Sequence, residues 1–250
     1  MGSTELAEHI APVLADGTGK ARAPLVSALP TLKQYISLLF DTPKFLAMFW
    51  NSVSLVLPIV LGQVVVGTLA AWGFAHFRFP GREPLFMLYI ALMMMPFQVT
   101  LVPTYLVLDS LSLLNHPLAV ILPGIFNTFA VFLLRQFFQS IPESLTEAAT
   151  IDGAGELRIF AHIAIPLGMS GVASLFVLSF LDYWNLIEPP LTFLKDQDTW
   201  PLSLYLTTIG QSNVEVAMAA SVLTLLPALL LFLYGESYLV RGIRLTGLKE

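Results

Sequence analysis

Five apolar stretches that contain no Asp, Glu, Lys or Arg divide the chain, and each approaches the length of a membrane-crossing helix. A helix rises about 1.5 Å per residue, so roughly 20 apolar residues cross the ~30 Å hydrocarbon core of a bilayer. The strands of a membrane barrel would be shorter and would alternate in polarity, which these stretches do not. The pattern predicts an all-α polytopic bundle of about five transmembrane spans, at Val53–Ala75, Pro84–Leu108, Pro117–Leu134, Ile163–Leu181 and Val216–Gly235.

The composition agrees with a protein embedded in a lipid bilayer. Of the 250 residues, 56% are hydrophobic and 12% are charged, and the mean hydropathy is +0.77. Soluble domains carry about 25% charged residues, so lipid must cover part of the apolar surface of this chain. The formal net charge of −5 is spread over the loops without an acidic or basic run, which argues against nucleic acid as a partner.

Candidate groups for catalysis or metal binding are sparse. The chain has no cysteine and no clustered Ser/His/Asp set. The run from Gly17 to Lys20 lacks the glycine at position 14 and the Ser or Thr at position 21 that a phosphate-binding loop needs, so any ATP must be handled by a partner. We therefore expect no catalytic residue, no metal and no other cofactor, since the histidines are too scattered for a zinc site: His9, His76, His116 and His162.

Lysine and arginine predict the orientation of the spans. Basic residues gather in three connections, after the first, third and fifth predicted spans, while the intervening loops hold only Lys195. Because cytoplasmic loops carry the excess of positive charge, these connections and the C-terminus are expected in the cytoplasm, and the N-terminus outside. The basic residues concerned are Arg78, Arg82, Arg135, Arg158, Arg241, Arg244 and Lys249.

Residues 1–50 form an expected extracytoplasmic N-terminal segment ahead of a membrane domain at residues 51–250. This segment contains no hydrophobic signal long enough to export it. Either a helix upstream of this sequence is missing, or the first span exports its own tail. We favour the missing helix, because several basic residues oppose unaided export: Lys20, Arg22, Lys33 and Lys44.

The most informative segment, residues 142–166, connects the third and fourth predicted spans and is too highly charged to lie in hydrocarbon. Pro142 suits a first helical turn, and Glu143 and Glu147 favour the positive end of the helix dipole. The run from Asp152 to Gly155 then breaks the helix, since glycine readily adopts turn conformations. We expect a compact helix–turn–helix on the cytoplasmic face.

In this segment the chain resembles the permease subunits of binding-protein-dependent ABC importers. Their cytoplasmic coupling loop reads Glu-Ala-Ala, three residues, Gly, about nine residues and Ile-x-Leu-Pro. Here Glu147-Ala148-Ala149 precedes Gly153 at that spacing and Ile163-Ala164-Ile165-Pro166 follows, with Ile165 in place of the usual Leu. The string from Ala148 to Ala154 is most similar to the carbohydrate-type branch, the maltose-permease-like subunits. A further helix normally precedes this region in the family.

The resemblance implies a multi-pass inner-membrane permease that couples closure of ATP-binding subunits to alternating access, importing sugars or related solutes. The implied partners are two ATP-binding ABC subunits, a second homologous permease subunit, an extracytoplasmic solute-binding protein and the lipid bilayer. The small alanines would leave room for helix-in-groove docking. The implied coupling residues are Glu147, Ala148, Ala149, Asp152, Gly153 and Ala154. An ordinary cytoplasmic hairpin without a partner is the open alternative.

A polar cluster at the end of the fourth predicted span has two interpretations. Charges and aromatic rings at helix ends are typical of the membrane interface. Alternatively the cluster faces the substrate pathway, with Trp184 stacking on a sugar, and Asn127 within the third span is a comparable candidate. The cluster comprises Asp182, Tyr183, Trp184 and Asn185.

Helix-distorting and small residues also occur within the spans. Proline removes a helical hydrogen bond, and broken helices line many transport pathways, although membrane helices also carry harmless prolines. Gly67 and Ala71, four residues apart, suit close packing of helices. The prolines are Pro58, Pro96, Pro103, Pro123 and Pro227.

The sequence also bears on three other functions. A secondary transporter driven by an ion gradient would need Asp, Glu or His relays within the spans, and the five stretches contain none. A passive membrane scaffold would not explain the loop motif. An ABC permease for phosphate, amino acids or peptides shares that motif and stays open.

Overall fold

The apolar stretches of the sequence form helices in the computed structural model, which describes residues 32–41, 43–212 and 214–247. No strand occurs in these ranges, so the predicted all-α fold is confirmed. The elements are α2 (Lys33–Ile36), the π-helix η1 (Ser37–Asp41), α3 (Pro43–His76), α4 (Arg82–Met93), α5 (Phe97–Ser110), α6 (Leu118–Ile125), α7 (Thr128–Phe138), α8 (Glu143–Ile151), α9 (Glu156–Ile159), the π-helix η2 (Phe160–Ala164), α10 (Ile165–Leu167), α11 (Met169–Trp184), α12 (Glu188–Phe193), the 3-10 helix η3 (Gln197–Thr199), α13 (Leu202–Ser212) and α14 (Val214–Gly247).

The described helices supply up to five membrane crossings. Three segments are long and apolar enough to cross a bilayer, and two pairs of helices qualify only if each bent pair is counted as one span. The bends are 98° between α4 and α5, and 70° between the α9–α10 segment and α11. The three candidates that qualify without a bent pair are Pro43–His76, Leu118–Phe138 and Val216–Tyr238.

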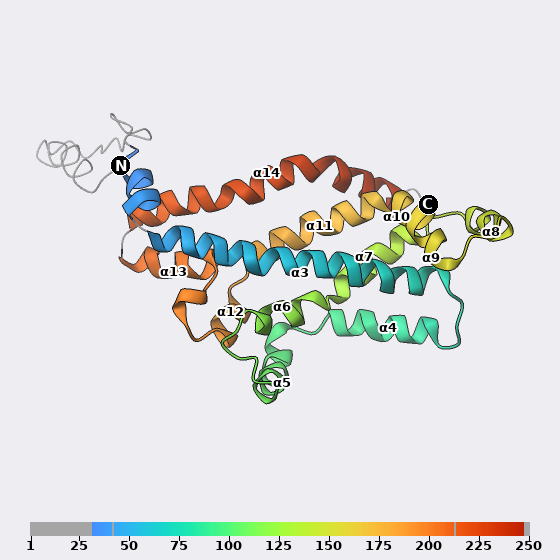
Figure 1. Ribbon diagram of the computed structural model, residues 1–250, viewed down its shortest axis with the longest axis horizontal. Coiled ribbons are helices and arrows are strands. Elements are labelled where there is room, and N and C mark those ends of the chain that lie inside the picture. Colours follow the sequence, from blue (N-terminus) through green and yellow to red (C-terminus); the bar gives the residue numbers. More distant parts are fainter. Residues whose placement is uncertain (1–31, 42, 213, 248–250) are drawn as a thin grey trace, which may run out of the picture.

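Helix α3 lies along the long axis of the bundle beside α11, and α14 packs on α11 (Figure 1). One face of α3 is buried against α6, α7 and α11, and includes Ile59, Gln63 and Ala71. The opposite face exposes large apolar side chains at four-residue intervals. In water such a stripe would be unfavourable, whereas lipid or another membrane subunit covers it at little cost. The stripe comprises Leu57, Leu61, Val65 and Leu69.

The boundary expected at residue 50 falls inside α3. The helix begins at Pro43, a residue well suited to a first helical turn because its missing N–H has no intrahelical partner there. Residues 43–50 therefore continue the first span rather than belonging to a separate segment. The remainder of the expected N-terminal segment, residues 1–31, lies outside the described residues.

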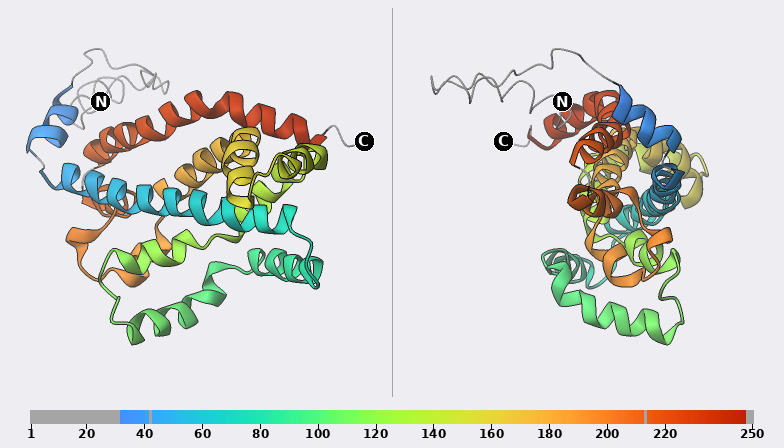
Figure 2. Two further views of the ribbon diagram at one scale, coloured as in Figure 1. Left: turned by 45° about the vertical axis from the view of Figure 1, so that its right-hand side comes forward. Right: turned by 90° about the vertical axis from the view of Figure 1, so that its left-hand side faces the viewer.

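The second predicted span is not one straight helix. Helix α4 has 12 residues, and its length of about 18 Å is too short for a bilayer core. The chain then turns at Met94–Pro96, and α5 runs across the bundle (Figures 1 and 2). Pro96 lacks an N–H and disfavours helical backbone in Met95, which explains the break. The remaining prolines named from the sequence lie inside helices.

Small residues allow the helices to approach closely. A Cβ atom added at Gly67 of α3 would lie 3.1 Å from the Cβ of Ala130 in α7. At Gly171 of α11 it would lie 2.5 Å from the ring of Phe137. Because lipid gives helices no hydrophobic reason to associate, such close van der Waals packing contributes much of the stability.

We expect Gly67→Leu to destabilise the bundle by about 1–3 kcal/mol, because the larger side chain overpacks the contact between α3 and α7. The matched control is Gly73→Leu on the same helix, where nothing lies within 4 Å of an added Cβ. Chemical unfolding of the purified protein in detergent measures both changes. Equal effects at the two positions would contradict the close-packing argument.

Candidate functional site

The connection between α7 and α11 forms the predicted helix–turn–helix. Helix α8 ends in a Schellman motif, in which the Ala154 amide donates to the Ala149 carbonyl at 2.9 Å and the Gly153 amide donates to the Thr150 carbonyl at 3.0 Å. Gly153 has φ +81°, a left-handed conformation that favours glycine. The glycine in the sequence therefore fixes the angle between α8 and α9. We refer to residues 143–159 as the α8–α9 hairpin.

The inner side of the α8–α9 hairpin packs on the end of the bundle. Ile159 is buried, with 1% of its surface exposed, in a cluster that also contains Trp72 and Leu134. Ala149 and Ala154 contact the same cluster and are partly buried. Two of the six predicted coupling residues therefore hold the hairpin in place, and the remaining four are exposed: Glu147, Ala148, Asp152 and Gly153.

The outer side of the hairpin carries apolar side chains that the sequence reasoning did not select. Ile151 is 86% exposed and Leu157 is 81% exposed, on either side of the turn. Large apolar residues in a charged, irregular segment outside the spans are a signal that could have found them, because exposed apolar groups in water mark contact surfaces.

Ion pairs join the hairpin to the end of α3. The Arg78 guanidinium donates to both carboxylate oxygens of Glu143, at 2.7 and 3.0 Å. This hydrogen bond and the negative charge of Glu143 raise the pKa of Arg78 above its ordinary value. His76 Nε2 lies 3.2 Å from a carboxylate oxygen of Glu156. The two helices of the hairpin are thus connected to the last residue of α3 and to the loop that follows it.

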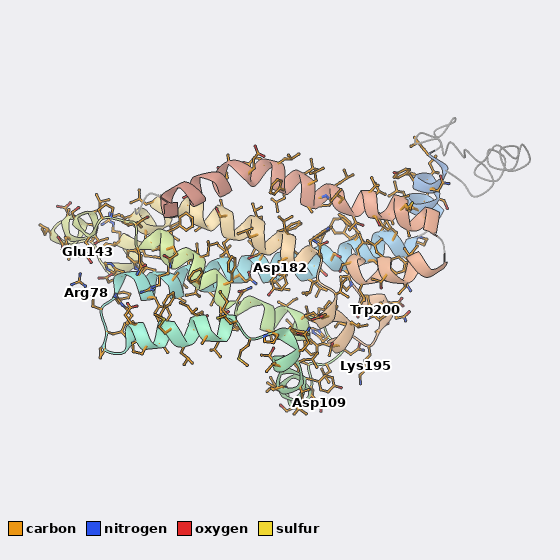
Figure 3. All side chains as sticks on the ribbon, turned by 180° about the vertical axis from the view of Figure 1, so that it is seen from behind. Arg78, Asp109, Glu143, Asp182, Lys195 and Trp200 are labelled. Atoms are coloured by element: carbon orange, nitrogen blue, oxygen red, sulfur yellow. The ribbon has the colours of Figure 1, made fainter. Side chains whose placement is uncertain are left out.

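A cavity of about 960 Å³ lies where several helices are interrupted. Its wall comes from the α4–α5 bend, the break between α6 and α7, and the end of α11 with the start of α12. Figure 3 shows Asp182, one of the lining residues, between the ends of the molecule, away from Arg78 and Glu143 at one end and from Lys195 at the other. Irregular backbone at membrane depth is tolerated where it lines a cavity. These three breaks all line this cavity.

The structure brings four of the five predicted pathway residues to this cavity: Asn127, Asp182, Tyr183 and Asn185. Asn127 also has a structural task, because its side-chain oxygen accepts a hydrogen bond from the Phe129 amide and caps α7. These polar side chains come from two different breaks in the helices.

Trp184 does not line the cavity, and its predicted stacking on a sugar does not fit the geometry. Only 3% of its surface is exposed. Its indole Nε1 donates to the Thr224 carbonyl at 3.0 Å, and its ring stacks on Phe180. A helix turns its side chains by about 100° per residue, so Trp184 faces α14 while Asp182 and Tyr183 face the cavity.

Gln63 is a further polar residue at the site that the sequence reasoning missed. Its side chain is fully buried in α3, where its amide donates to the Gly124 carbonyl at 2.7 Å and its oxygen accepts from the Ser179 hydroxyl at 2.6 Å. The Tyr183 hydroxyl also donates to Gly124, at 3.2 Å. The network joins three helices beside the cavity. A lone glutamine within an apolar span was the available signal.

A helical membrane bundle with a polar cavity at its helix breaks defines the class of polytopic transport proteins. More specifically, the chain belongs to the family described as "Binding-protein-dependent transport system inner membrane component", whose model matches residues 63–249. It is a permease subunit of the inner membrane and not a catalytic subunit.

Two relatives illustrate the similarity. The arabinooligosaccharides transport system permease protein AraQ of Halalkalibacterium halodurans is 32% identical over 88% of this chain and 80% of its own length. The sn-glycerol-3-phosphate transport system permease protein UgpE of Pectobacterium atrosepticum is 34% identical over 81% of this chain and 74% of its own.

A solved structure shares the fold. A bacterial ABC transporter that imports the acidic polysaccharide alginate superposes on 85% of this chain with a TM-score of 0.75 and 22% identity, and 82% of that chain is covered. The same type of transporter bound to a periplasmic protein carrying an alginate pentasaccharide gives a TM-score of 0.62 and 18% identity, with 92% of each chain covered.

We expect Gln63→Leu to destabilise the protein by about 1–3 kcal/mol. The buried Ser179 hydroxyl loses its acceptor, and the Gly124 carbonyl loses one of its two side-chain donors. Tyr183→Phe keeps the hydrogen bond from the Gln63 amide to the Gly124 carbonyl, so its loss of stability should be smaller. Gln139→Leu, at an exposed position, is the control. Chemical unfolding in detergent measures the three variants, and a Gln63→Leu protein as stable as the control would contradict the network's role.

Proposed function

We propose that this chain is one of the two permeases of an ATP-driven importer for sugars or related polyhydroxylated solutes. Its partners would be a second homologous permease, two ATP-binding subunits and an extracytoplasmic solute-binding protein. The observation that carries the proposal is that the segment after the α8–α9 hairpin, η2 and α10, leads through a 70° bend into α11, and that α11 ends at the cavity. The 16 residues of α11 extend about 24 Å, so a movement of the hairpin would pass through this bend and along one helix to the cavity wall.

The α8–α9 hairpin has the properties of a docking element for the ATP-binding subunits. Exposed apolar side chains at Ile151 and Leu157 gain by burial against a partner. Ile159 is buried against the bundle, and the contacts of Glu143 with Arg78 and of Glu156 with His76 add to this attachment, so the hairpin would move with the bundle rather than independently. Closure of the ATP-binding subunits would thus shift the bundle between two packed arrangements, which is what alternating access requires.

The charge distribution supports an orientation with the hairpin and the C-terminus in the cytoplasm. Arg78, Arg82, Arg135 and Arg158 lie on or beside the elements at the hairpin end of the bundle. In Figure 1 the C-terminal end of α14 lies at that same end. Basic residues favour the cytoplasmic side. The solute-binding protein would then dock at the other end, near η3 and α12.

The solute class is proposed from the relatives and the cavity together. The two relatives belong to transport systems for arabinooligosaccharides and sn-glycerol-3-phosphate, and the structural neighbour imports alginate. All three solutes carry two or more hydroxyl groups. The cavity offers polar groups from Asn127, Asp182 and Asn185 beside the rings of Phe97 and Phe126, a mixture that suits solutes with hydroxyl groups on an apolar carbon frame.

We expect Gly153→Asp to lower ATP-dependent, vanadate-sensitive uptake into membrane vesicles by about tenfold or more, while the amount of protein in the membrane stays unchanged. No atom of the described residues lies within 4 Å of an added Cβ at Gly153, so the loss would come from a charge placed against the docked partner.

Gly81→Asp is the matched control for this experiment. Gly81 has φ +84° and also has no atom within 4 Å of an added Cβ, so the backbone strain is the same. Uptake by Gly81→Asp should stay close to that of the parent. Full uptake by Gly153→Asp, or equal losses in both variants, would contradict docking at the hairpin turn.

We expect Ile151→Ser to weaken the retention of the ATP-binding subunits during purification by about fivefold or more, because an exposed anchor residue loses its apolar contact. The stability of the isolated chain should not change, because the Ile151 side chain is exposed. Leu111→Ser, at a 60% exposed position beyond α5, serves as the control. Unaltered retention by Ile151→Ser would remove this side chain from the proposed interface.

A further inference from the structure

The charged residues that line the cavity are both acidic. Among the described residues of its wall, Asp182 and Glu188 carry charge, and no lysine, arginine or histidine is present. Lys195, the nearest basic residue along the chain, lies beyond α12 and is not part of the wall. A solute that enters the cavity therefore meets negative charge that this chain does not compensate.

The two carboxylates differ in their partners. Glu188 accepts hydrogen bonds from the Gln98 amide at 3.1 Å on each of its oxygens, which ties α12 to α5. Asp182 has no hydrogen bond or ion pair to another residue in the described part of the chain, and its side chain is exposed to the cavity. Its oxygens are consequently the acceptors that remain free for a ligand.

A free carboxylate discriminates strongly between classes of polyhydroxylated solute. It can accept hydrogen bonds from several hydroxyl groups at once, and bonds to an ionised acceptor are stronger than neutral ones. A solute that carries its own phosphate or carboxylate is repelled by the same charge, and this repulsion is poorly screened inside a membrane cavity. The aromatic rings of Phe97, Phe126 and Tyr183 complete a wall suited to the apolar faces of sugar rings.

We propose that the cavity admits uncharged glycans and rejects anionic ones, with Asp182 as the specificity-determining residue. This inference rests on the proposed function and deepens it. The expected solute of this chain then differs from those of two similar proteins, because sn-glycerol-3-phosphate and alginate are anions. It agrees with that of the third, because arabinooligosaccharides are neutral. The selection occurs at the membrane, in addition to any selection made by a solute-binding protein.

The test measures solute binding to the assembled transporter in lipid nanodiscs, without the solute-binding protein, so that its specificity does not enter. The probes are radiolabelled arabinotriose, which is neutral, and trigalacturonate, which has the same number of sugar rings and is anionic. We expect arabinotriose to bind at least about tenfold more tightly than trigalacturonate. In Asp182→Asn this ratio should fall about tenfold, because the repulsion and the charge-assisted hydrogen bonds are both lost.

Asp109→Asn is the control, since Asp109 is exposed on α5 and outside the cavity wall, and it should leave the ratio unchanged. Asp182→Glu, which keeps the charge, should retain the preference. Binding of trigalacturonate as tight as that of arabinotriose, an unchanged ratio in Asp182→Asn, or no detectable arabinotriose binding at millimolar concentration would overturn the inference.

The importer function is tested separately, with the same purified transporter reconstituted into proteoliposomes. With the solute-binding protein added, ATP-dependent uptake of any solute into proteoliposomes supports the proposed function whatever the binding ratio is. A transporter that takes up anionic and neutral solutes equally would remain an importer while the role of Asp182 failed. A preparation that shows no ATP-dependent uptake of any solute would count against the importer function itself.

Discussion

The carbonyl group of Gly124 is the point on which the interior of this protein depends. A backbone acceptor that leaves its helix inside a membrane needs a new donor, because no water is available in hydrocarbon. Helix α6 ends one residue later, and the Gln63 amide from α3 and the Tyr183 hydroxyl from α11 supply the donors. Three helices are thereby joined beside the cavity. The break that makes room for a solute is the same feature that fixes the surrounding helices.

Lipid provides no hydrophobic force between helices, so close contact between small and large residues holds the rest of the bundle together. Such contacts join α3 to α7 at Gly67, α7 to α11 at Gly171, and α11 to α14 at Gly235, where an added Cβ would lie 2.4 Å from Val177. Helix α4, by contrast, packs mainly on α7, and α5 leaves the bundle axis (Figure 2). The cavity therefore lies between a tightly packed block and a more weakly attached layer.

Local chemistry explains what could be predicted from the sequence. The spans and the turn at Gly153 depend on side chains a few residues apart, and the structure contains both. The position of the sharp bend does not depend on local chemistry alone. Pro58, Pro103 and Pro227 remain inside helices, whereas Pro96 lies at the 98° bend, immediately before α5. Proline only weakens a helix, and the packing of neighbouring helices decides whether it breaks.

The end of α11 shows that local sequence also could not predict which side chains of the site face the cavity. The sequence grouped Asp182, Tyr183, Trp184 and Asn185, but successive side chains of a helix point in different directions. Trp184 consequently binds the Thr224 carbonyl of α14, while its neighbours face the cavity. This anchor has a mechanical consequence. Because Trp184 and Val177 attach α11 to α14 along its length, a displacement passed from the α8–α9 hairpin to α11 would carry α14 with it, and the part of the cavity wall formed by α11 would move with two helices rather than one.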